Sequence, residues 1–440
     1  MLAHTDLLAR VEHSGVHFLD LQFSDIVGAV KSLTIPVAAL PDALDHGVWF
    51  DGSSVEGFAR IAESDLCLEP EPATFARLPW LSGDQATGRL ICQVRSVTGE
   101  PYSGDPRGAL TRGIAAAAQM GFVFHTSPEV EFFLLKPAAP SSPAAPHDSV
   151  GYFDVPDETA SRMRRQLAAA AAAFGIVIES MHHEVAAGQH EIDFRHSDAL
   201  STADNLSTFR FVLMIVAQQN GLQATFLPKP IPGLNGSGMH VHQSLAYKTG
   251  GRNAFFDPGD AHGLSQIAKH FIAGQLAHAD AMCAVLAPLV NSYKRLVAGF
   301  EAPTQVSWAR VNRGALIRVP RADRPQATRV ELRCPDSGCN PYLALAVMLA
   351  AGLDGIRRRL PAPPASDENL ARPNRAAATA PGYLPRSLEA ALNALEKDVV
   401  IQEALGAHIY ERFVTAKRID IKNYSQTVSP WELEQHLLQH

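Results

Sequence analysis

The first hundred residues alternate between hydrophobic and polar positions with the period of two that is typical of β-strands. Residues 16–36 contain two such runs, and residues 25–28 between them have the composition of a turn. Residues 38–45 predict a short helix beside these strands. The pattern therefore predicts a small mixed-sheet domain over residues 1–100, and a larger domain over residues 101–440.

From residue 105 to residue 120 the hydrophobic period becomes helical, and strands are predicted at residues 122–126 and 129–135. Further helices are predicted at residues 157–174, 204–220, 262–286, 341–360 and 388–405. Residues 136–149 and 360–385 are rich in proline or small residues and predict exposed loops. Strands and helices that alternate in this way predict an α+β fold.

Composition narrows the possible partners. The net charge of −7 offers no basic stripe for nucleic acid. The five cysteines form no C-x-x-C pair, which suits a reducing compartment. The amino terminus has no secretory signal pattern, and the longest apolar run, residues 167–178, is too short to span a bilayer. We therefore expect a cytoplasmic protein with no nucleic-acid or membrane partner.

Segments between residues 129 and 333 combine carboxylates, imidazoles and guanidiniums at the spacing of strand neighbours. They are Glu129-Val-Glu131, His182-His-Glu184 with Gln189-His-Glu191, His240-Val-His242, and Arg329-Val-Glu331-Leu-Arg333. Residues i and i+2 of a strand point to the same face, so the paired side chains of each segment would project together. A single pair of this kind usually marks the wet face of a strand. Several pairs with apolar neighbours favour one shared cavity.

The chemistry of these side chains predicts a site for metal ions and phosphate. Carboxylate oxygens with one or two imidazole nitrogens suit Mg²⁺ or Mn²⁺ better than zinc. The interleaved arginines imply a polyanion beside the metals. The chain has neither a G-x-x-x-x-G-K-[ST] loop nor a G-x-S-x-G elbow. If ATP binds, metals and arginines must hold it.

A longer set of motifs occurs in order along the chain. It comprises Phe50-Asp-Gly-Ser-Ser, Pro128-Glu-Val-Glu-Phe-Phe, His183-Glu-Val-Ala-Ala-Gly-Gln-His-Glu, Asn235-Gly-Ser-Gly-Met-His, Asn291-Ser-Tyr-Lys-Arg-Leu-Val, Glu301-Ala-Pro and Asn340-Pro-Tyr-Leu-Ala. This highly specific set resembles the type I glutamine synthetase family. The resemblance implies an N-terminal β-grasp domain and a large catalytic domain with a curved antiparallel sheet and surrounding helices. It also implies a dodecamer of two hexameric rings, with each active site between neighbouring subunits.

The resemblance assigns a role to each candidate residue. Glu131, Glu184 and Glu191 would hold one Mg²⁺ or Mn²⁺ ion, and Glu129, His240 and Glu331 a second. Arg295 and Arg333 would bind the carboxylates of L-glutamate, and Asn235 and Gly236 its amino-acid end. ATP and its phosphates would meet Glu179, His242, Ser244, Arg313, Arg318 and Arg329. The ammonium pocket would consist of Tyr152, Glu184 and the flap residue Glu301, with Asp51 and Ser54 from the adjacent subunit.

These roles imply ATP-dependent ligation of ammonia to glutamate through γ-glutamyl phosphate, with Asp51, Glu301 and Arg313 as catalytic residues. Some positions depart from the family pattern: Gln326, Phe300 and Gly314 stand where lysine, tyrosine and serine are usual. Two alternatives therefore stay open, a ligase that uses a larger amine and a catalytically silent nitrogen-sensing or structural relative. Arg60 resembles the feedback-inhibited branch of the family, although an exposed arginine is also common at surfaces.

Overall fold

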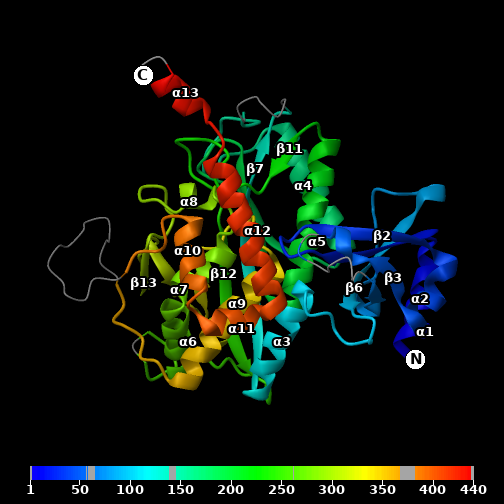
Figure 1. The fold of residues 1–440 in the computed structure, drawn as a ribbon, viewed down its shortest axis with the longest axis horizontal. Helices are drawn as coiled ribbons and strands as arrows, with labels where there is room; N and C mark the ends of the chain where they lie inside the picture. Colours follow the sequence, from blue (N-terminus) through cyan, green and yellow to red (C-terminus); the bar gives the residue numbers. More distant parts are fainter. Residues whose placement is uncertain are drawn as a thin grey trace.

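The computed structural model describes residues 2–55, 57, 65–137, 145–260, 262–366 and 382–437. Arg60 lies outside this range, as do parts of the two predicted proline-rich loops. Within it, the chain forms a small unit built on a six-stranded sheet and a larger unit built on a nine-stranded sheet (Figure 1). No helix among the described residues is both long enough and apolar enough to cross a membrane.

The small sheet is formed by the predicted strand pair and its neighbours. Its strand order is β2-β1-β6-β4-β3, and β5 also pairs with β6. The elements are α1 (Leu2–Ser14), β1 (Phe18–Ser24), β2 (Val30–Pro36), α2 (Leu40–His46), β3 (Val48–Asp51), β4 (Asp65–Pro70), β5 (Ala76–Arg77) and β6 (Thr87–Arg95). The helices α1 and α2 cover an apolar core of side chains from β1, β4 and β6. The two strands and the helix predicted before residue 46 are confirmed.

The large sheet has the order β13-β14-β15-β12-β7-β9-β8, and β10 and β11 pair with β7. Its strands are β7 (Phe122–Leu135), β8 (Ile178–His183), β9 (Gln189–Phe194), β10 (Ser197–Asp198), β11 (Gln223–Thr225), β12 (Met239–Tyr247), β13 (Gln305–Ala309), β14 (Ala315–Arg318) and β15 (Val330–Leu332). The pairs are antiparallel except β13 with β14, which is parallel. The α+β prediction is confirmed, with this one departure from an antiparallel sheet.

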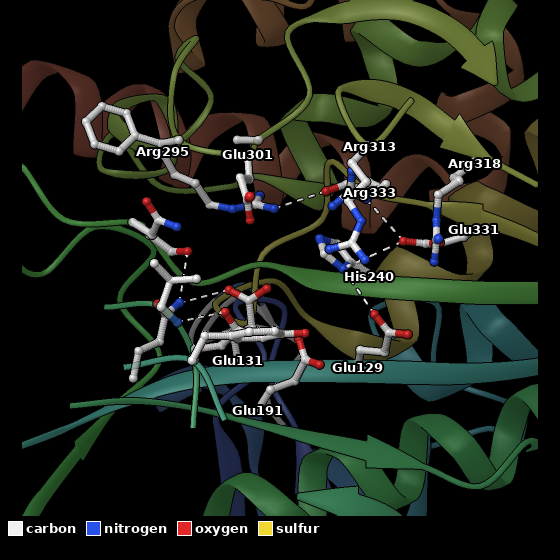
Figure 2. A pocket seen from close by; sticks show the side chains of 18 residues that line it. Glu129, Glu131, Glu191, His240, Arg295, Glu301, Arg313, Arg318, Glu331 and Arg333 are labelled. Carbon is white, nitrogen blue, oxygen red and sulfur yellow. Dashed lines mark hydrogen bonds and ion pairs between the residues drawn. The ribbon is translucent and has the colours of Figure 1, made fainter. Parts of the chain in front are cut away.

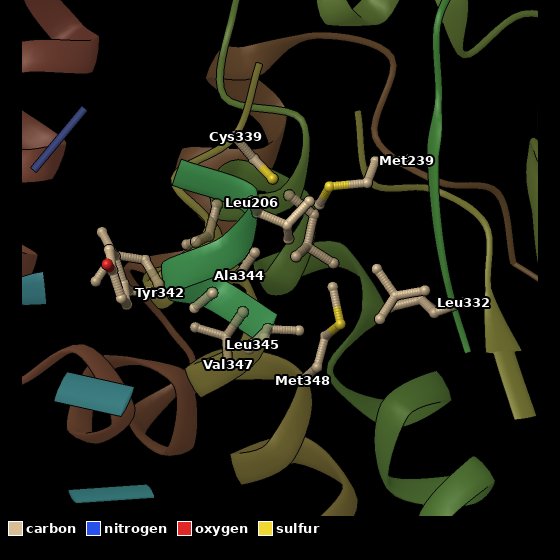
Figure 3. Packing of buried hydrophobic residues seen from close by; sticks show 14 of the residues in the cluster. Leu206, Met239, Leu332, Cys339, Tyr342, Ala344, Leu345, Val347 and Met348 are labelled. Carbon is tan, nitrogen blue, oxygen red and sulfur yellow. The ribbon is translucent and has the colours of Figure 1, made fainter. Parts of the chain in front are cut away.

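Helices of the large unit pack against the sheet and one another. They are α3 (Pro106–Gln119), α4 (Glu158–Ala173), α5 (Ala199–Gln219), α6 (Gln266–Ala277), α7 (Ala279–Leu286), α8 (Ser292–Arg295), α9 (Pro341–Arg358), α10 (Leu388–Leu395), α11 (Val399–Leu405), α12 (Ala407–Ser425) and α13 (Pro430–His436). The helix α9 is buried along most of its length and contributes Leu345 and Met348 to the core that also holds Met239 of β12 (Figure 3). This core supports the strand β12 from behind.

Several predicted boundaries were wrong. The two strands predicted at residues 122–126 and 129–135 are one strand, β7, which continues through Pro128. The helix predicted at residues 204–220 starts earlier, because Asp198 caps α5 by accepting a hydrogen bond from the Ser201 amide at 3.0 Å. The helices predicted at residues 262–286 and 388–405 are each two helices, which separate at His278 and before Asp398.

The two breaks meet in a buried ion-pair cluster. His278 Nδ1 lies 2.6 Å from Asp398 Oδ2, and His278 Nε2 lies 3.0 Å from Asp354 Oδ2 of α9. Burial alone would lower the pKa of His278, but its bonds to Asp398 and Asp354 outweigh burial and raise the pKa above the usual 6.5. The cluster therefore joins α7, α9 and α11 most strongly while His278 is protonated.

We expect His278→Asn to lower the free energy of unfolding by about 3 kcal/mol at pH 6, because the buried Asp354 and the partly buried Asp398 lose the cation that they share. A raised pKa in the folded state gives stability that is complete below pH 6.5 and is lost as the pH rises through the folded pKa. The difference between wild type and variant should therefore shrink between pH 6 and pH 9 in urea unfolding. His270→Asn is the control, because the His270 ring hydrogen-bonds the backbone carbonyl of Leu360. A pH-independent difference for His278→Asn would contradict the ion-pair role.

Candidate functional site

The register of the large sheet gathers the acidic and imidazole side chains predicted to form a site. His240 of β12 is opposite Glu129 of β7, and Glu131 of β7 is opposite Glu191 of β9. On the other side of β12, Glu331 of β15 is opposite His242. Since alternate residues of a strand share one face, these side chains project from neighbouring strands to the same side of the sheet.

They line one cavity of about 280 Å³, which we call the metal cavity (Figure 2). The lining comprises Glu129, Glu131, Tyr152, Glu184, Val185, Gln189, Glu191, Asn235, Gly236, His240, Arg295, Phe300, Glu301, Ala302, Arg313, Arg318, Glu331 and Arg333. All the predicted metal ligands are present. The predicted glutamate-binding side chains border the same space, together with Tyr152 and Glu301. Figure 2 shows Arg295, Arg313, Arg318 and Arg333 on the side opposite Glu131 and Glu191.

In one half of the metal cavity each carboxylate lies beside imidazole or guanidinium groups. The Glu129 carboxylate lies 3.1 Å from His240 Nδ1 and 2.6 Å from His242 Nε2. Burial would raise the pKa of Glu129, but these two imidazoles reverse the shift and hold the pKa far below its usual range. Glu331 is buried between Arg318 and Arg333, and its Oε1 lies 3.1 Å from Arg333 Nε. Both carboxylates are thereby kept ionised and able to bind a metal.

In the other half of the metal cavity, fewer positively charged groups lie near the carboxylates. Glu131 Oε2 accepts hydrogen bonds from the Gly238 amide and from Gln189 Nε2, both at 2.9 Å. Burial raises the pKa of Glu131, and burial together with the neighbouring carboxylates, Glu131 foremost, raises the pKa of Glu191 to about 11. A divalent cation between these groups would favour their charged forms.

The donor set fits a hard divalent cation. One ligating atom from each of Glu129, Glu191 and His240 lies within 4.8 Å of the others. Oxygen-rich sets with a single imidazole suit Mg²⁺ or Mn²⁺. The buried carboxylates with raised pKa give an independent reason to expect a cation, because two anions this close are stable only when neutralised or paired.

Arg333 has the properties expected of an anion-binding residue. It is buried, and its Nε and Nη1 atoms have no hydrogen-bond acceptor among the described residues, although Nε lies close to Glu331. Buried guanidinium donors without acceptors are costly unless a ligand satisfies them. The bidentate fork of arginine suits a carboxylate or phosphate. The arrangement therefore supports an anionic ligand in the metal cavity.

Arg295 is more constrained than the sequence suggested. Its Nη1 donates to the carbonyls of Cys334 and Pro335 at 2.9 and 3.1 Å, and its Nη2 donates to the Arg333 carbonyl at 3.0 Å. Gly238 packs against the same guanidinium, since a Cβ at this position would lie 2.4 Å from Arg295 Nη2. Arg295 thus fixes the backbone beside Arg333, and only its remaining donors are left for a ligand.

Tyr152 and Glu301 border the open side of the metal cavity. Tyr152 is 47% exposed, and burial and Glu184 raise its pKa while Arg313 opposes the shift. Glu301 is exposed and has a positive φ of 56°, a conformation that is unfavourable for a residue with a Cβ. Strain of this kind is common where a loop is held over a functional site.

A second cavity, of about 490 Å³, adjoins the metal cavity through their common lining residue Glu129. Of the predicted nucleotide-binding residues, Glu179, His242, Ser244 and Arg329 line it, whereas Arg313 and Arg318 line the metal cavity. Gln326, one of the departures from the family pattern, also lies here. The predicted nucleotide residues thus divide between two adjoining cavities.

Asp51 and Ser54 lie apart from both cavities of their own chain, at the end of β3 and in the short turn that follows. The Asp51 carboxylate accepts a hydrogen bond from the Ser53 amide at 2.8 Å, and hydrogen bonds from Ser53 lower its pKa. The resemblance assigned these residues to the site of an adjacent subunit, and that assignment stays a prediction.

Three residues that support the metal cavity had no assigned role in the sequence analysis, although His182 and Gln189 belong to the strand segments named there. His182 Nε2 lies 3.0 Å from Glu184 Oε1 and 3.5 Å from Glu191 Oε1. Gln189 bridges Glu131 and the Gly236 carbonyl, at 2.9 and 3.1 Å. Asp193 pairs in register with Glu129 and groups with His182 and Glu191. Asp193 is two residues after Glu191 on β9, so extending the period of two beyond the named segment Gln189-His-Glu191 would have added it.

Hydrogen bonds outside the metal cavity hold the loop that carries Glu184. Asp148 Oδ1 accepts a hydrogen bond from the Gly188 amide at 2.8 Å and lies 3.2 Å from Nε2 of His183, which is fully buried. The Glu184 amide donates to the Gln189 carbonyl at 2.8 Å and closes the loop. The backbone of Glu184 is therefore held in place on both sides.

Comparisons with known proteins agree with this geometry. The glutamine synthetase β-grasp domain matches residues 15–97, and the glutamine synthetase catalytic domain matches residues 103–436. The relatives include glutamine synthetases of Thermus thermophilus, 50% identical over 98% of both chains, and of Halobacterium salinarum, 48% identical over 98% of this chain and 96% of the relative. Among solved structures, a GmaS/ADP complex and GmaS without ligand are each 33% identical, with a TM-score of 0.87 over 98% of this chain and 99% of theirs.

Proposed function

The chain belongs to the glutamine synthetase family, and from this membership we propose that it ligates ammonia to the γ-carboxylate of L-glutamate while ATP is converted to ADP and phosphate. Glutamine synthetases use ATP and divalent metal ions. The observation that carries the proposal is the metal cavity, in which buried carboxylates and His240 face arginines, and buried donors of Arg333 have no acceptor among the described residues. A catalytically silent relative would not be expected to keep this whole set.

The reaction proceeds in two steps. The γ-carboxylate oxygen of glutamate attacks the γ-phosphorus of ATP, which gives γ-glutamyl phosphate and releases ADP. Ammonia then attacks the carbonyl carbon of γ-glutamyl phosphate, the C–O bond to phosphate breaks, and phosphate leaves as the amide forms. Glu131, Glu184 and Glu191 would hold one metal ion and Glu129, His240 and Glu331 a second, and these ions would neutralise charge on the transferred phosphoryl group.

The protein's own residues position and protect the reactants. Arg333, with part of Arg295, binds the carboxylates of glutamate, because a planar guanidinium pairs with carboxylate through two hydrogen bonds. Asn235 and the Gly236 backbone hold its amino-acid end. Arg313 and Arg318 lie in the metal cavity with them and contact the phosphoryl oxygens. The nucleotide lies toward the second cavity, against His242, Ser244, Glu179 and Arg329.

Ammonium must be attracted as a cation and then deprotonated. At neutral pH ammonia is present almost entirely as the ammonium cation, so an anionic pocket favours its binding. Tyr152, Glu184 and Glu301 border the metal cavity from this chain. We propose that Asp51 of an adjacent subunit accepts the proton, with Ser54 beside it, in the dodecamer of two rings that the family resemblance implies.

Ligation of a larger amine is the second candidate, and the GmaS structures are the reason to test it. The polar border of Tyr152 and the carboxylates of Glu184 and Glu301 favours ammonium, because a bulkier amine needs a wider and less polar opening. The test measures phosphate release and amide products with ATP, Mg²⁺ or Mn²⁺ and glutamate, comparing ammonium with methylamine, ethanolamine and a polyamine. A higher kcat/KM for ammonium than for each amine supports the proposal, and a preference for one amine overturns it.

Glu301 is expected to keep water from γ-glutamyl phosphate. Glu301→Ala should therefore raise glutamate-dependent ATP hydrolysis, relative to amide formation, by roughly tenfold. Alanine keeps the Cβ, so the backbone strain at the positive φ is similar in both proteins. Phosphate and amide are measured in the same reaction, with the exposed Glu403→Ala on α11 as the control. An unchanged ratio would refute this role.

A further inference from the structure

Lys229 belongs to one of two loops that border the metal cavity, and its side chain contacts the other. We define the flap as residues 299–302 and the amino-acid loop as residues 228–238. The flap carries Phe300 and Glu301, and the amino-acid loop carries Asn235 and Gly236, all of which line the cavity. Neither Lys229 nor its contacts belong to the residues assigned a role above.

The Lys229 ammonium contacts the flap and the backbone of its own loop at once. Its Nζ lies 3.7 Å from the centroid of the Phe300 ring, a distance at which cation–π attraction is strong. The same Nζ donates a hydrogen bond to the Leu234 carbonyl, next to Asn235. The described residues give Lys229 no carboxylate partner within ion-pair distance, so the ring and the carbonyl are its recorded contacts.

The backbone of Lys229 is held in turn by a third segment. The Lys229 amide donates to Asn291 Oδ1 at 2.7 Å, and Asn291 Nδ2 donates to the Lys229 carbonyl at 3.1 Å. Asn291 lies directly before α8, the short helix that ends at Arg295. Lys229 is therefore anchored to the segment that carries Arg295 while its ammonium reaches the flap.

The flap itself has few other means of holding this position. Gly299 has φ of 93° and Glu301 has φ of 56°, so both residues flanking Phe300 are in the left-handed region. Glu301 is unfavourable there and needs an external contact to keep the turn. The Phe300 ring on Lys229 supplies such a contact immediately before Glu301.

We propose that Lys229 is a positioning residue that latches the flap to the amino-acid loop, so that Glu301 covers the cavity only when Asn235 is in place. The expected effect on phosphate release and amide formation rests on the proposed function. Latching of this kind couples amino-acid binding to the exclusion of water, because both loops share one ammonium. Phenylalanine at position 300 can make this contact as well as the usual tyrosine could, since either ring offers a π face to the cation.

The test uses two variants that break the contact and two that keep it. Lys229→Met retains the aliphatic stem without the charge, and Phe300→Leu removes the π face. Lys229→Arg and Phe300→Tyr retain cation and ring. In the full-length protein, Lys229→Met and Phe300→Leu should each raise phosphate release relative to amide formation by about fivefold, which is the scale of one cation–π contact. The double variant should add little to either single change.

The controls separate a latch from a general structural role. Lys229→Arg and Phe300→Tyr should stay within twofold of wild type, and the KM for ATP should not change in any variant. Arg252→Met removes a different cation–π contact, with Tyr247, that borders neither cavity. Additive effects of Lys229→Met and Phe300→Leu, or an unchanged ratio, would overturn the proposal.

Hydrogen exchange tests the latch without turnover. Lys229→Met and Phe300→Leu should both speed amide exchange in residues 297–302, and Arg252→Met should not. Faster exchange in a protein without ligase activity would support the latch and reject the proposed function. Unchanged exchange in an active enzyme would reject the latch alone.

Discussion

Glu191→Gln is expected to weaken the binding of Mn²⁺ by at least about 100-fold and to abolish glutamate-dependent phosphate release. Glu191 lies opposite Glu131 on the paired strands and contributes to two groups of possible ligating atoms, one with Glu129 and His240 and one with His182 and Asp193. Glutamine keeps the shape of the side chain but not its charge. A hard cation binds a neutral amide much more weakly than a carboxylate at this position.

The same substitution should cost little stability in the absence of metal. Burial and neighbouring carboxylates raise the pKa of Glu191 to about 11, so at neutral pH the metal-free side chain holds a proton and resembles glutamine. Thermal unfolding with and without Mn²⁺ therefore separates the two effects. We expect Mn²⁺ to raise the Tm of wild type more than the Tm of Glu191→Gln, in which the second ion can still bind to Glu129, His240 and Glu331. An equal shift in both proteins would show that Glu191 is not a ligand.

Arg313→Gln is expected to lower kcat by about 10³-fold while changing the KM for ATP by less than tenfold. Arg313 lies in the metal cavity with Arg318 and close to Tyr152, where charge would develop on the transferred phosphoryl group. An interaction made mainly in the transition state appears in kcat and not in substrate binding.

Arg321→Gln is the matched control, because Arg321 is exposed and borders neither the metal cavity nor the second cavity. Steady-state rates at saturating ATP, glutamate and ammonium decide the result. A raised KM for ATP with an unchanged kcat would show that Arg313 acts in nucleotide binding and not in catalysis. Equal losses in both variants would indicate a general electrostatic effect instead.

The sequence pattern grouped residues that line one cavity, but it placed several helix boundaries wrongly. Glu129, Glu131, His240 and Glu331 could be grouped because the strand period is local and β7, β12 and β15 are regular there. The strand through Pro128 was divided because proline usually interrupts a sheet, yet pairing with β12 and β9 on both sides keeps β7 continuous. Tertiary pairing overrode the local signal.

Long-range contacts explain what could not be read from the sequence. The helix break at His278 is stabilised by Asp354 and Asp398, which are distant in the chain. Arg295 lies at the cavity as its motif implied, but its bonds to backbone carbonyls around Pro335 depend on how two loops meet. The contact between Lys229 and Phe300 likewise joins segments that no periodic pattern connects.

The central claim is that this chain forms glutamine from ammonia, and isotope transfer tests it most directly. Purified protein is incubated with [¹⁵N]ammonium, L-glutamate, ATP and Mg²⁺ or Mn²⁺, and the products are identified by mass spectrometry. We predict glutamine with ¹⁵N in its side-chain amide and one phosphate released for each glutamine formed. Unlabelled products, or an amide formed only when methylamine or another amine replaces ammonium, would contradict the claim.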